Sequence, residues 1–424
     1  MSFLAAVIVF AVTYVLLLIF SKYRAYIALA SAIIFVIWAK LSFAELVDAI
    51  DFNVLMMIAG TMGIVVLFVD SKMPQLLADI LVSKAPNAKW AIMLLALFAG
   101  IISAFVDNVA TVLMVAPVAL AICKKQNLSP VLPIIAIAVS SNLQGAATLV
   151  GDTTSILLGN YAGMDFLDFF WFLGKPGIFF VVEIGAVLSA LTLLFIFRKE
   201  KQKLEVQEKT QVTDYFPSAL MILVVVLLIA ASFIPNKPSI TNGIICMGLM
   251  VVGIIYNLIK TKKPDMMVKI FKEMDYFTLL LLAGLFVIIA GITKAGVIDK
   301  LAQLFMNIGG NSLFVMYTII VFMSVLFSAF IDNIPYVATM LPVIQSIALM
   351  MGIAPYVLYF GLLIGATLGG NLTPIGASAN ITGIGILRKE GHDVKFKDFF
   401  KIGVPFTLTA VATGYIFIWI FYGM

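Results

Sequence analysis

Long apolar runs separated by short polar segments dominate the chain. An α-helix needs about 20 mostly apolar residues to cross the hydrocarbon core of a bilayer. The pattern predicts an all-α polytopic membrane protein with ten crossings, at 2–20, 25–40, 52–70, 130–158, 176–197, 217–235, 239–258, 276–293, 355–387 and 402–422.

Two further apolar stretches, 90–123 and 312–351, are each long enough to enter the membrane and return. Each has a polar pair at its middle, Asp107-Asn108 in the first and Asp332-Asn333 in the second. Non-helical backbone at this depth is tolerated only where protein or a water-filled cavity surrounds it. We therefore interpret both stretches as re-entrant helical hairpins that leave the membrane on the side from which they entered.

The spans after the two hairpins, 130–158 and 355–387, are interrupted by small and polar residues. Their centres, 140–155 and 369–380, are rich in Gly, Ser, Thr and Asn, which favour unwinding of the helix. Unwound carbonyls can coordinate a cation, and the free amides at the start of a half-helix can hold an anion. Both spans are therefore expected to be broken at a binding site.

The chain repeats itself in a constant register. Residues 103–118 align with 328–343, and the same register brings Thr148 onto Thr373 and Gly151 onto Gly376. Each half has an odd number of predicted crossings, so the second half is expected to have the opposite orientation. This predicts two inverted repeats, 1–197 and 217–424, joined by a cytoplasmic linker at 198–216, an architecture typical of secondary transporters.

The composition supports a membrane protein and excludes several classes. Hydrophobic residues make up 63% of the 424 residues and charged residues 12%, against about 25% charged in soluble domains. A soluble enzyme, a nucleic-acid-binding protein and a disordered chain are excluded. With the loop at 21–24 in the cytoplasm, cytoplasmic segments hold all basic residues except Lys40, Lys175, Lys237, Lys294 and Lys300. This bias orients inner-membrane proteins and predicts a prokaryotic inner-membrane location with both termini outside.

Motifs for cofactors and for ATP hydrolysis are not found. Cys123, Cys246 and the single His392 form no metal-ligand pattern, and no Walker sequence occurs. The sequence therefore predicts no cofactor, no ATPase activity in this chain and no zinc chemistry. The expected partners are membrane lipid and a small ion or solute.

Asp107 and Asp332 are the strongest candidate functional residues. An ionisable group within the membrane costs about 2.5–3.5 kcal/mol on insertion scales unless it is hydrated or paired. A structural helix cap is the alternative for both, but their repetition beside Asn favours an ion or proton site. Asp152 has Ala377 as its counterpart, and both function and helix capping stay open for it; Glu183 is interpreted as reaching the outer interface.

Neutral polar residues in the breaks and hairpins complete the predicted ion- and substrate-binding set. The full set is Asp107, Asn108, Thr111, Asn142, Thr148, Gly151, Asp152, Thr153, Asp332, Asn333, Asn371, Thr373, Ser378 and Asn380. A bound sodium ion is expected at Asp107, Asn108, Asp332 and Asn333. No Arg or Lys is expected within a span core, so the predicted site is acidic and favours proton or sodium binding, with a neutral or weakly acidic solute.

The motifs at 103–108, 328–335 and 368–380 resemble the ion transporter superfamily over essentially the whole chain. The resemblance is strongest to its arsenite-permease-like and P-protein-like branch, which is related to divalent anion/sodium symporters and citrate transporter-like permeases. The segment Gly151-Asp152-Thr153-Thr154-Ser155 replaces the Gly-Asp-Pro-Pro-Asn common in relatives and is similar to a class of bacterial sodium/proton antiporters.

The resemblance implies a homodimer with a scaffold domain and a transport domain that carries the hairpin tips across the membrane as an elevator. The dicarboxylate transporters of the superfamily have Ser-Asn-Thr at these tips, where this chain has Asp107-Asn108-Val109 and Asp332-Asn333-Ile334. The leading hypothesis is therefore a proton- or sodium-coupled secondary transporter. The alternatives are a sodium-coupled di- or tricarboxylate symporter, an ion channel and an intramembrane aspartyl protease.

Overall fold

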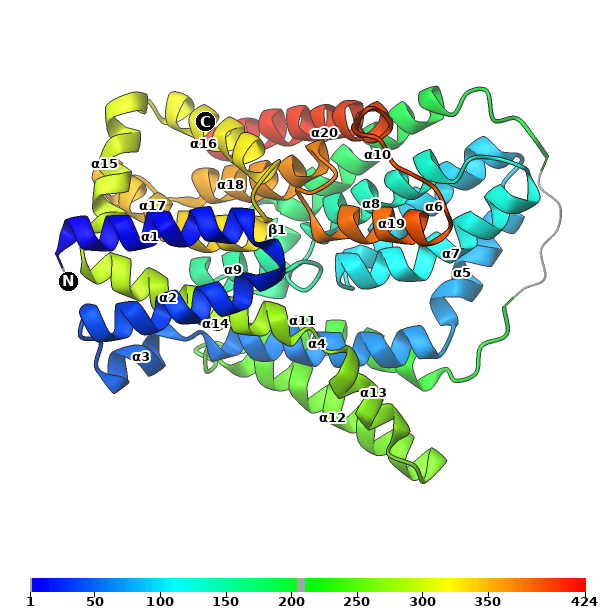
Figure 1. Ribbon diagram of the computed structural model, residues 1–424, viewed down its shortest axis with the longest axis horizontal. Helices are drawn as coiled ribbons and strands as arrows, with labels where there is room; N and C mark the ends of the chain where they lie inside the picture. Colours follow the sequence, from blue (N-terminus) through cyan, green and yellow to red (C-terminus); the bar gives the residue numbers. More distant parts are fainter. Residues whose placement is uncertain (1, 204–209) are drawn as a thin grey trace.

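The computed structural model describes residues 2–203 and 210–424, and helices dominate these ranges (Figure 1). The linker expected at 198–216 therefore falls partly, at 204–209, outside the described residues. The described strands are β1 (Trp171–Phe172) and β2 (Lys175–Pro176), which pair antiparallel in a small hairpin. Most helices lie along the long axis of the molecule, and both termini lie toward the same end (Figure 1).

Ten α-helices precede the linker, within the described residues. They are α1 (Phe3–Ile19), α2 (Arg24–Trp38), α3 (Phe43–Ala49), α4 (Phe52–Asp70), α5 (Met73–Ser83), α6 (Ala88–Ser103), α7 (Asn108–Lys125), α8 (Val131–Gly145), α9 (Thr153–Ala162) and α10 (Ile178–Ile196). Short 3-10 turns lie at Ser21–Tyr23 and Phe166–Phe169.

A second set of ten follows the linker in the described part of the chain. They are α11 (Phe216–Ser232), α12 (Thr241–Thr261), α13 (Asp265–Glu273), α14 (Tyr276–Lys294), α15 (Val297–Gly309), α16 (Leu313–Ser328), α17 (Asn333–Met351), α18 (Tyr356–Gly369), α19 (Ser378–Lys389) and α20 (Phe396–Ile418). A 3-10 turn at Gly370–Leu372 extends α18, and a π-helical turn at Trp419–Gly423 extends α20.

Seven helices of the described chain are long and apolar enough to cross a membrane, or eight if the pair α15 and α16, bent by 114°, is one span. This differs from the ten predicted crossings for two reasons. The apolar helices α1, α2 and α11 have only 15 to 17 residues, and the spans after the hairpins are each divided between two helices. Conversely, α7 and α17, the second arms of the predicted hairpins, pass the length criterion.

Equivalent contacts recur in the two halves. A Cβ on Gly60 of α4 would meet the backbone between Cys246 and Met247 of α12, and a Cβ on Gly284 of α14 would meet the backbone between Ala28 and Leu29 of α2. Gly284 is the repeat counterpart of Gly60, so these contacts make Cys246 the counterpart of Ala28. Two helix pairs, α4 with α12 and α14 with α2, each join one half of the chain to the other. They therefore pack through equivalent contacts.

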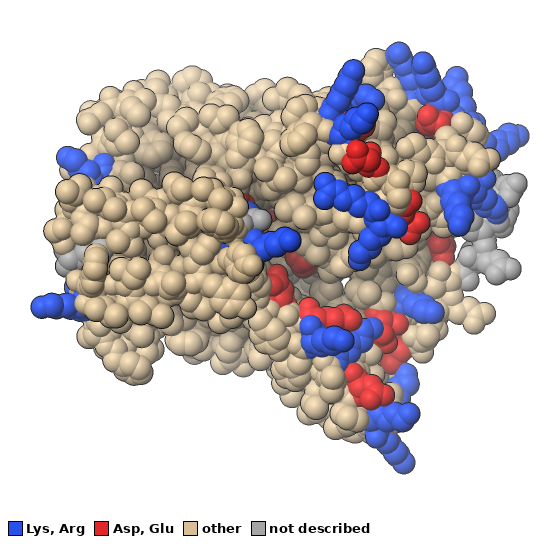
Figure 2. Space-filling view, viewed as in Figure 1, with Lys and Arg blue, Asp and Glu red and all other residues tan. Residues whose placement is uncertain are grey.

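Charged side chains are concentrated toward one end of the molecule. Figure 2 shows most Lys and Arg of the visible face near the end where α5 and α13 lie, and few at the opposite end. The chain termini lie toward that opposite, charge-poor end (Figure 1). Loops at the two ends of the helices therefore differ in charge, as the sequence pattern predicts.

Candidate functional site

The first hairpin turns at Asp107, between α6 and α7. The Asp107 carboxylate accepts hydrogen bonds from the amides of Val109 (3.0 Å) and Ala110 (3.3 Å) and so caps α7. The next side chain, Asn108, is held by the Ser103 hydroxyl, which donates to its Oδ1 at 2.6 Å. The cap that was the structural alternative for Asp107 is therefore present, and it fixes the carboxylate at the tip.

The second hairpin repeats this arrangement between α16 and α17. The Asp332 carboxylate accepts from the Ile334 amide at 3.1 Å, and the Ser328 hydroxyl donates to Oδ1 of Asn333. Both tips thus combine an Asp cap with an Asn that a Ser from the preceding helix orients. The repeated sequence motif produces the same local structure twice.

Each broken span packs directly against the hairpin tip of its own half. A Cβ on Gly151 would lie 2.5 to 2.7 Å from the carbonyl oxygens of Gly145, Ala104 and Ser103. A Cβ on Gly376 would lie 2.5 to 2.9 Å from the carbonyl oxygens of their three repeat counterparts. Only glycine allows such close approach of backbone to backbone. The hydroxyls of Thr148 and Thr373 donate to the carbonyls of Ala104 and Ala329, which ties the same segments together.

The two broken spans are joined to each other by amides. Asn142 of α8 donates to the Thr367 carbonyl (2.7 Å) and to Oδ1 of Asn371 (3.1 Å), and Asn371 donates to the Val139 carbonyl (2.8 Å). Asn142 also accepts from Asn108 at 3.3 Å. The first hairpin tip and both breaks are therefore connected through buried side chains.

A cavity of about 430 Å³ opens where the tips and breaks converge. The predicted residues that line it are Asp107, Asn108, Asn142, Asp152, Thr153, Asp332, Asn333 and Ser378. The Asp152 side chain makes no cap to an amide of α9 and instead accepts from the Thr154 hydroxyl at 2.8 Å. Three carboxylates from the two halves thus line one cavity together with neutral amide and hydroxyl groups.

The other predicted residues lie behind the cavity wall. Those that do not line it are Thr111, Thr148, Gly151, Asn371, Thr373 and Asn380. Thr148, Gly151, Asn371 and Thr373 make the packing contacts above, and Asn380 donates to the carbonyls of Gly370 and Thr373. Thr111 is fully buried, and its hydroxyl oxygen has no hydrogen-bond partner in the described structure. Glu183, on α10, is outside this cavity.

The expectation that no basic residue reaches the site is wrong. Arg24, assigned from the sequence to a cytoplasmic loop, begins α2 and pairs with Asp332 at 2.7 Å (Nη1 to Oδ2). The two side chains are only 13% and 10% exposed. The long Arg side chain extends from the helix end to the hairpin tip, which a count of charges along the sequence cannot detect.

Sequence reasoning also missed part of the rim. Glu273, Asp275 and Thr278, at the junction of α13 and α14, line the cavity, as do Met62, Val65 and Val66 of α4. The sequence repeat aligns Asp275 with Asp51, and this alignment was the signal that could have identified Asp275. No three His, Cys, Asp or Glu side chains of the described chain converge as a metal site, so neutral oxygens would supply most ligands of a bound cation.

Comparison with known proteins identifies transporters. An uncharacterized transporter of Mycobacterium tuberculosis is 31% identical over 382 residues, which cover 88% of this chain and 87% of the relative. The human P protein is 26% identical over 91% of this chain and 55% of its own length.

Solved structures with similar folds are also transporters. YdaH of Alcanivorax borkumensis superposes with a TM-score of 0.61 at 14% identity, over 89% of this chain and 88% of that chain. MtrF of Neisseria gonorrhoeae has a TM-score of 0.53 at 16% identity, over 86% and 80%, and is described with a class of antimetabolite efflux pumps. Residues 14–365 match the citrate transporter family, and we conclude that this chain is a multi-pass membrane protein that belongs to that family of secondary transporters.

Proposed function

We propose that the chain is a proton- or sodium-coupled secondary active transporter of a small ion or weak-acid solute. The observation that carries this proposal is the cavity that Asp107, Asp152 and Asp332 line together. Carboxylates at membrane depth mark ion pathways and proton relays. Their neighbours Asn108 and Asn333 supply neutral oxygens suited to a partly dehydrated cation.

Two inverted repeats and an elevator movement would give this site access to both faces of the membrane in turn. The repeated contacts of the tips, breaks and helix pairs support the duplication. The charge-poor end that holds both termini supports an orientation with the termini outside. A homodimer, with the scaffold formed by the helices outside the site, fits the same architecture.

The test is coupled flux in proteoliposomes. The purified chain should exchange protons or sodium ions across the membrane under an imposed pH or sodium gradient, and Asp107→Asn should abolish this exchange. Single-channel currents far above transporter turnover would instead indicate a channel.

A sodium-coupled symporter of di- or tricarboxylates is the second candidate. Arg24 favours it because this residue brings a fixed positive charge to the edge of the cavity, and guanidinium pairs well with carboxylates. The citrate transporter family supports the same substrate class. Uptake of labelled citrate that depends on sodium and is lost in Arg24→Gln would select this candidate over cation exchange alone.

A further inference from the structure

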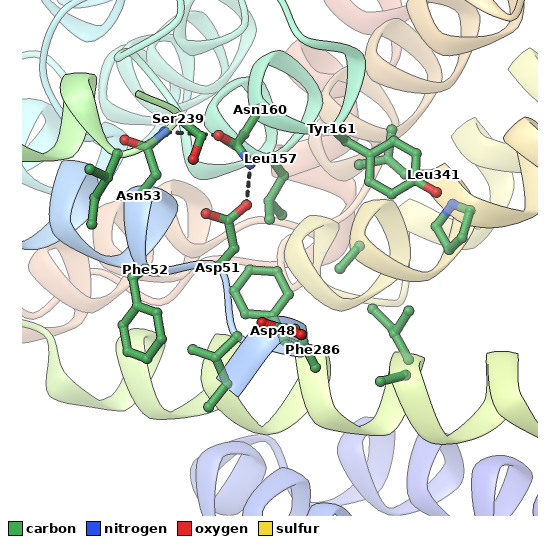
Figure 3. A pocket seen from close by; sticks show the side chains of 17 residues that line it. Asp48, Asp51, Phe52, Asn53, Leu157, Asn160, Tyr161, Ser239, Phe286 and Leu341 are labelled. Carbon is green, nitrogen blue, oxygen red and sulfur yellow. Dashed lines mark hydrogen bonds between the residues drawn. The ribbon is translucent and has the colours of Figure 1, made fainter. Parts of the chain in front are cut away.

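A second cavity, of about 520 Å³, lies between the start of α4 and helices α9, α14 and α17. Figure 3 shows Asp51 and Asn160 facing each other at one side of it, with Phe286 and Leu341 on other walls. Nothing in the proposed transport site uses these residues. The cavity therefore needs a separate explanation.

Part of the lining of each cavity is the repeat counterpart of part of the other. Phe286, Ile289 and Ala290 of the second cavity are the counterparts of Met62, Val65 and Val66 of the first, in the register that aligns Gly284 with Gly60. The same register pairs Asp51 of the second with Asp275 of the first, and the hairpin register pairs Ala338 with Leu113. Equivalent faces of α14 and α4 therefore line the two cavities, as expected if the two halves exchange roles between two states.

A chain of hydrogen bonds lines the second cavity at its polar side. Asn160 of α9 donates to the Asp51 carboxylate, and Asn53 donates to Oδ1 of Asn160 at 2.8 Å (Figure 3). The Gly243 amide donates to Oδ1 of Asn53 at 2.8 Å. These bonds tie α9 to α4 and α12.

The equivalent hydrogen bonds are missing from the first cavity. Asp275 accepts from Thr278 of its own helix at 2.6 Å. The counterpart of Asn160 is Gly385, and a Cβ there would have no neighbour within 4 Å among the described residues. The second cavity is therefore bridged on its polar side by hydrogen bonds that the first cavity lacks.

Asn242, at the start of α12, has an unsatisfied acceptor beside the second cavity. Its side chain is buried (8% exposed), and its Oδ1 has no hydrogen-bond partner in the described structure. It lines a space of about 430 Å³ that shares Asn53, Asn160 and Ser239 with the second cavity. A buried acceptor without a donor costs about 1–3 kcal/mol, so a group that arrives in another state would remove this cost.

The glycine contacts fix how α2 aligns with α12. The contacts at Gly60 and Gly284 make Ala28 and Cys246 counterparts, as described above. A second pair of contacts, Gly253 with Leu67 and Gly291 with Phe35, gives the same alignment of the two helices. Two independent contacts along each helix therefore agree on one register.

This register indicates which group arrives at Asn242. Asn242 lies as far before Cys246 as Arg24 lies before Ala28, so Asn242 is the counterpart of Arg24. Because Arg24 holds Asp332 in the present state, the exchanged arrangement brings Asp107 to Asn242.

We propose that the second cavity is the access route to the opposite face, and that Asn242 is the polar group that receives Asp107 when the transport site opens there. This inference rests on the proposed transport function. Separation of Asn160 from Asp51 opens the route, and release of Asp332 from Arg24 accompanies it.

Arg24 and Asn242 bind different forms of a carboxyl group. A guanidinium donates hydrogen bonds and pairs with a bare carboxylate, whereas an amide oxygen accepts. Oδ1 of Asn242 therefore fits an Asp107 carboxyl that carries a proton or a sodium ion. The present state thus holds a charged Asp332, and the opposite state receives a loaded Asp107.

The test uses single cysteines in a chain with Cys123→Ala and Cys246→Ala, reconstituted in proteoliposomes. Val66→Cys and Ala290→Cys report the two cavities through their rates of reaction with a membrane-impermeant maleimide added to either face. We expect Val66→Cys to react from one face and Ala290→Cys from the other, with opposite changes in rate when pH is lowered or sodium is added. The condition that raises the Ala290→Cys rate identifies the load as a proton or as sodium.

Asn242→Leu removes the acceptor and should slow the Ala290→Cys reaction about fivefold, the effect of one neutral hydrogen bond on an equilibrium. Asn242→Asp keeps an oxygen at the same position and should restore the rate. Asn257→Leu, on the same helix but outside both cavities, is the matched control and should change neither rate.

Two results would overturn the inference. Reaction of Ala290→Cys from the same face as Val66→Cys removes the access route, and equal rates in Asn242→Leu and Asn257→Leu remove the role of Asn242. Labelling does not require transport, so these outcomes are distinct from failure of the proposed function, which is absence of coupled flux in the unsubstituted chain.

Discussion

The two hairpin tips share their backbone but differ in charge. Asp107 and Asp332 cap equivalent helices, and each is followed by an Asn that a Ser holds. Arg24 pairs with Asp332, whereas in the described chain no Lys or Arg pairs with Asp107. The two tips therefore share their backbone structure and differ in the groups that set the charge of the site.

Helices α1 and α2 add to the difference at the second tip. The Tyr14 hydroxyl donates to the Pro335 carbonyl at 2.7 Å, just beyond the tip that Arg24 holds. The break beside the first tip instead carries Asp152, where the second has Ala377. One tip is thus fixed by basic and phenolic donors, and the other faces a second carboxylate.

The largest effect is expected from Asp107→Asn. This change keeps the size and the helix-capping ability of the side chain but removes the exchangeable charge, so coupled flux in proteoliposomes should fall by about two orders of magnitude or more, an expectation in line with the role of intramembrane carboxylates. Asp79→Asn is the control, since Asp79 is also buried but accepts hydrogen bonds from Thr210, away from the cavity. Normal flux in Asp107→Asn would contradict the comparison directly.

Arg24→Gln should have the second-largest effect, and this effect is on the stability of the fold. It leaves Asp332 buried without its partner, which costs about 3–5 kcal/mol for such a pair. Thermal unfolding in detergent should therefore occur at a clearly lower temperature.

The double variant Arg24→Gln with Asp332→Asn should recover most of that stability, because no unpaired charge remains. Recovery of stability without recovery of flux would separate the structural role of the pair from its role in transport. If the single variant is as stable as the parent chain, the pair does not hold the tip.

Gly151→Ala and Gly376→Ala probe what the two halves share. Each added Cβ would lie within 3 Å of three backbone oxygens, and overpacking of this kind costs about 1–3 kcal/mol. We expect similar losses of thermal stability in both variants. Gly385→Ala, with open space around it, is the control, and a loss at one position only would mean that the two breaks are not equivalent.

Glu45→Gln should have the smallest effect. Its ion pair with Lys294 is exposed (46% and 42%), and such pairs contribute little. Hydrogen bonds from Lys294 and Ser42 lower the pKa of Glu45 to about 2, so this carboxylate stays charged throughout the neutral and mildly acidic range. Any pH dependence of flux in that range should be unchanged in Glu45→Gln, as measured beside the parent chain.

Much of the site could be predicted from the sequence, because polar residues in the middle of apolar runs are conspicuous. The tips at Asp107 and Asp332 and the breaks around Gly151 and Gly376 all lie where the pattern placed them. The family was also predictable from these motifs. The sequence did not predict which of the neutral residues face the cavity. The conformation of the unwound backbone decides whether a side chain such as Thr148 points into the cavity or binds a carbonyl.

Contacts that depend on tertiary geometry were beyond sequence reasoning. Arg24 belongs by sequence to a basic loop, and only the packing of α2 beside the second tip shows that its side chain reaches Asp332. The amphipathic helices α13 and α15 were missed because they are short and half polar. The seven helices long enough to cross a membrane differ from the ten predicted crossings because helix ends and breaks, which the apolar runs do not mark, decide the length of each helix.

The amides of Asn142 and Asn371 have a mechanical consequence. They join α8 to the end of α18, because each amide donates a hydrogen bond to a group of the other broken span. In the elevator movement proposed above, these bonds would make the two broken helices move together. The two half-sites would then keep one binding geometry at both faces of the membrane.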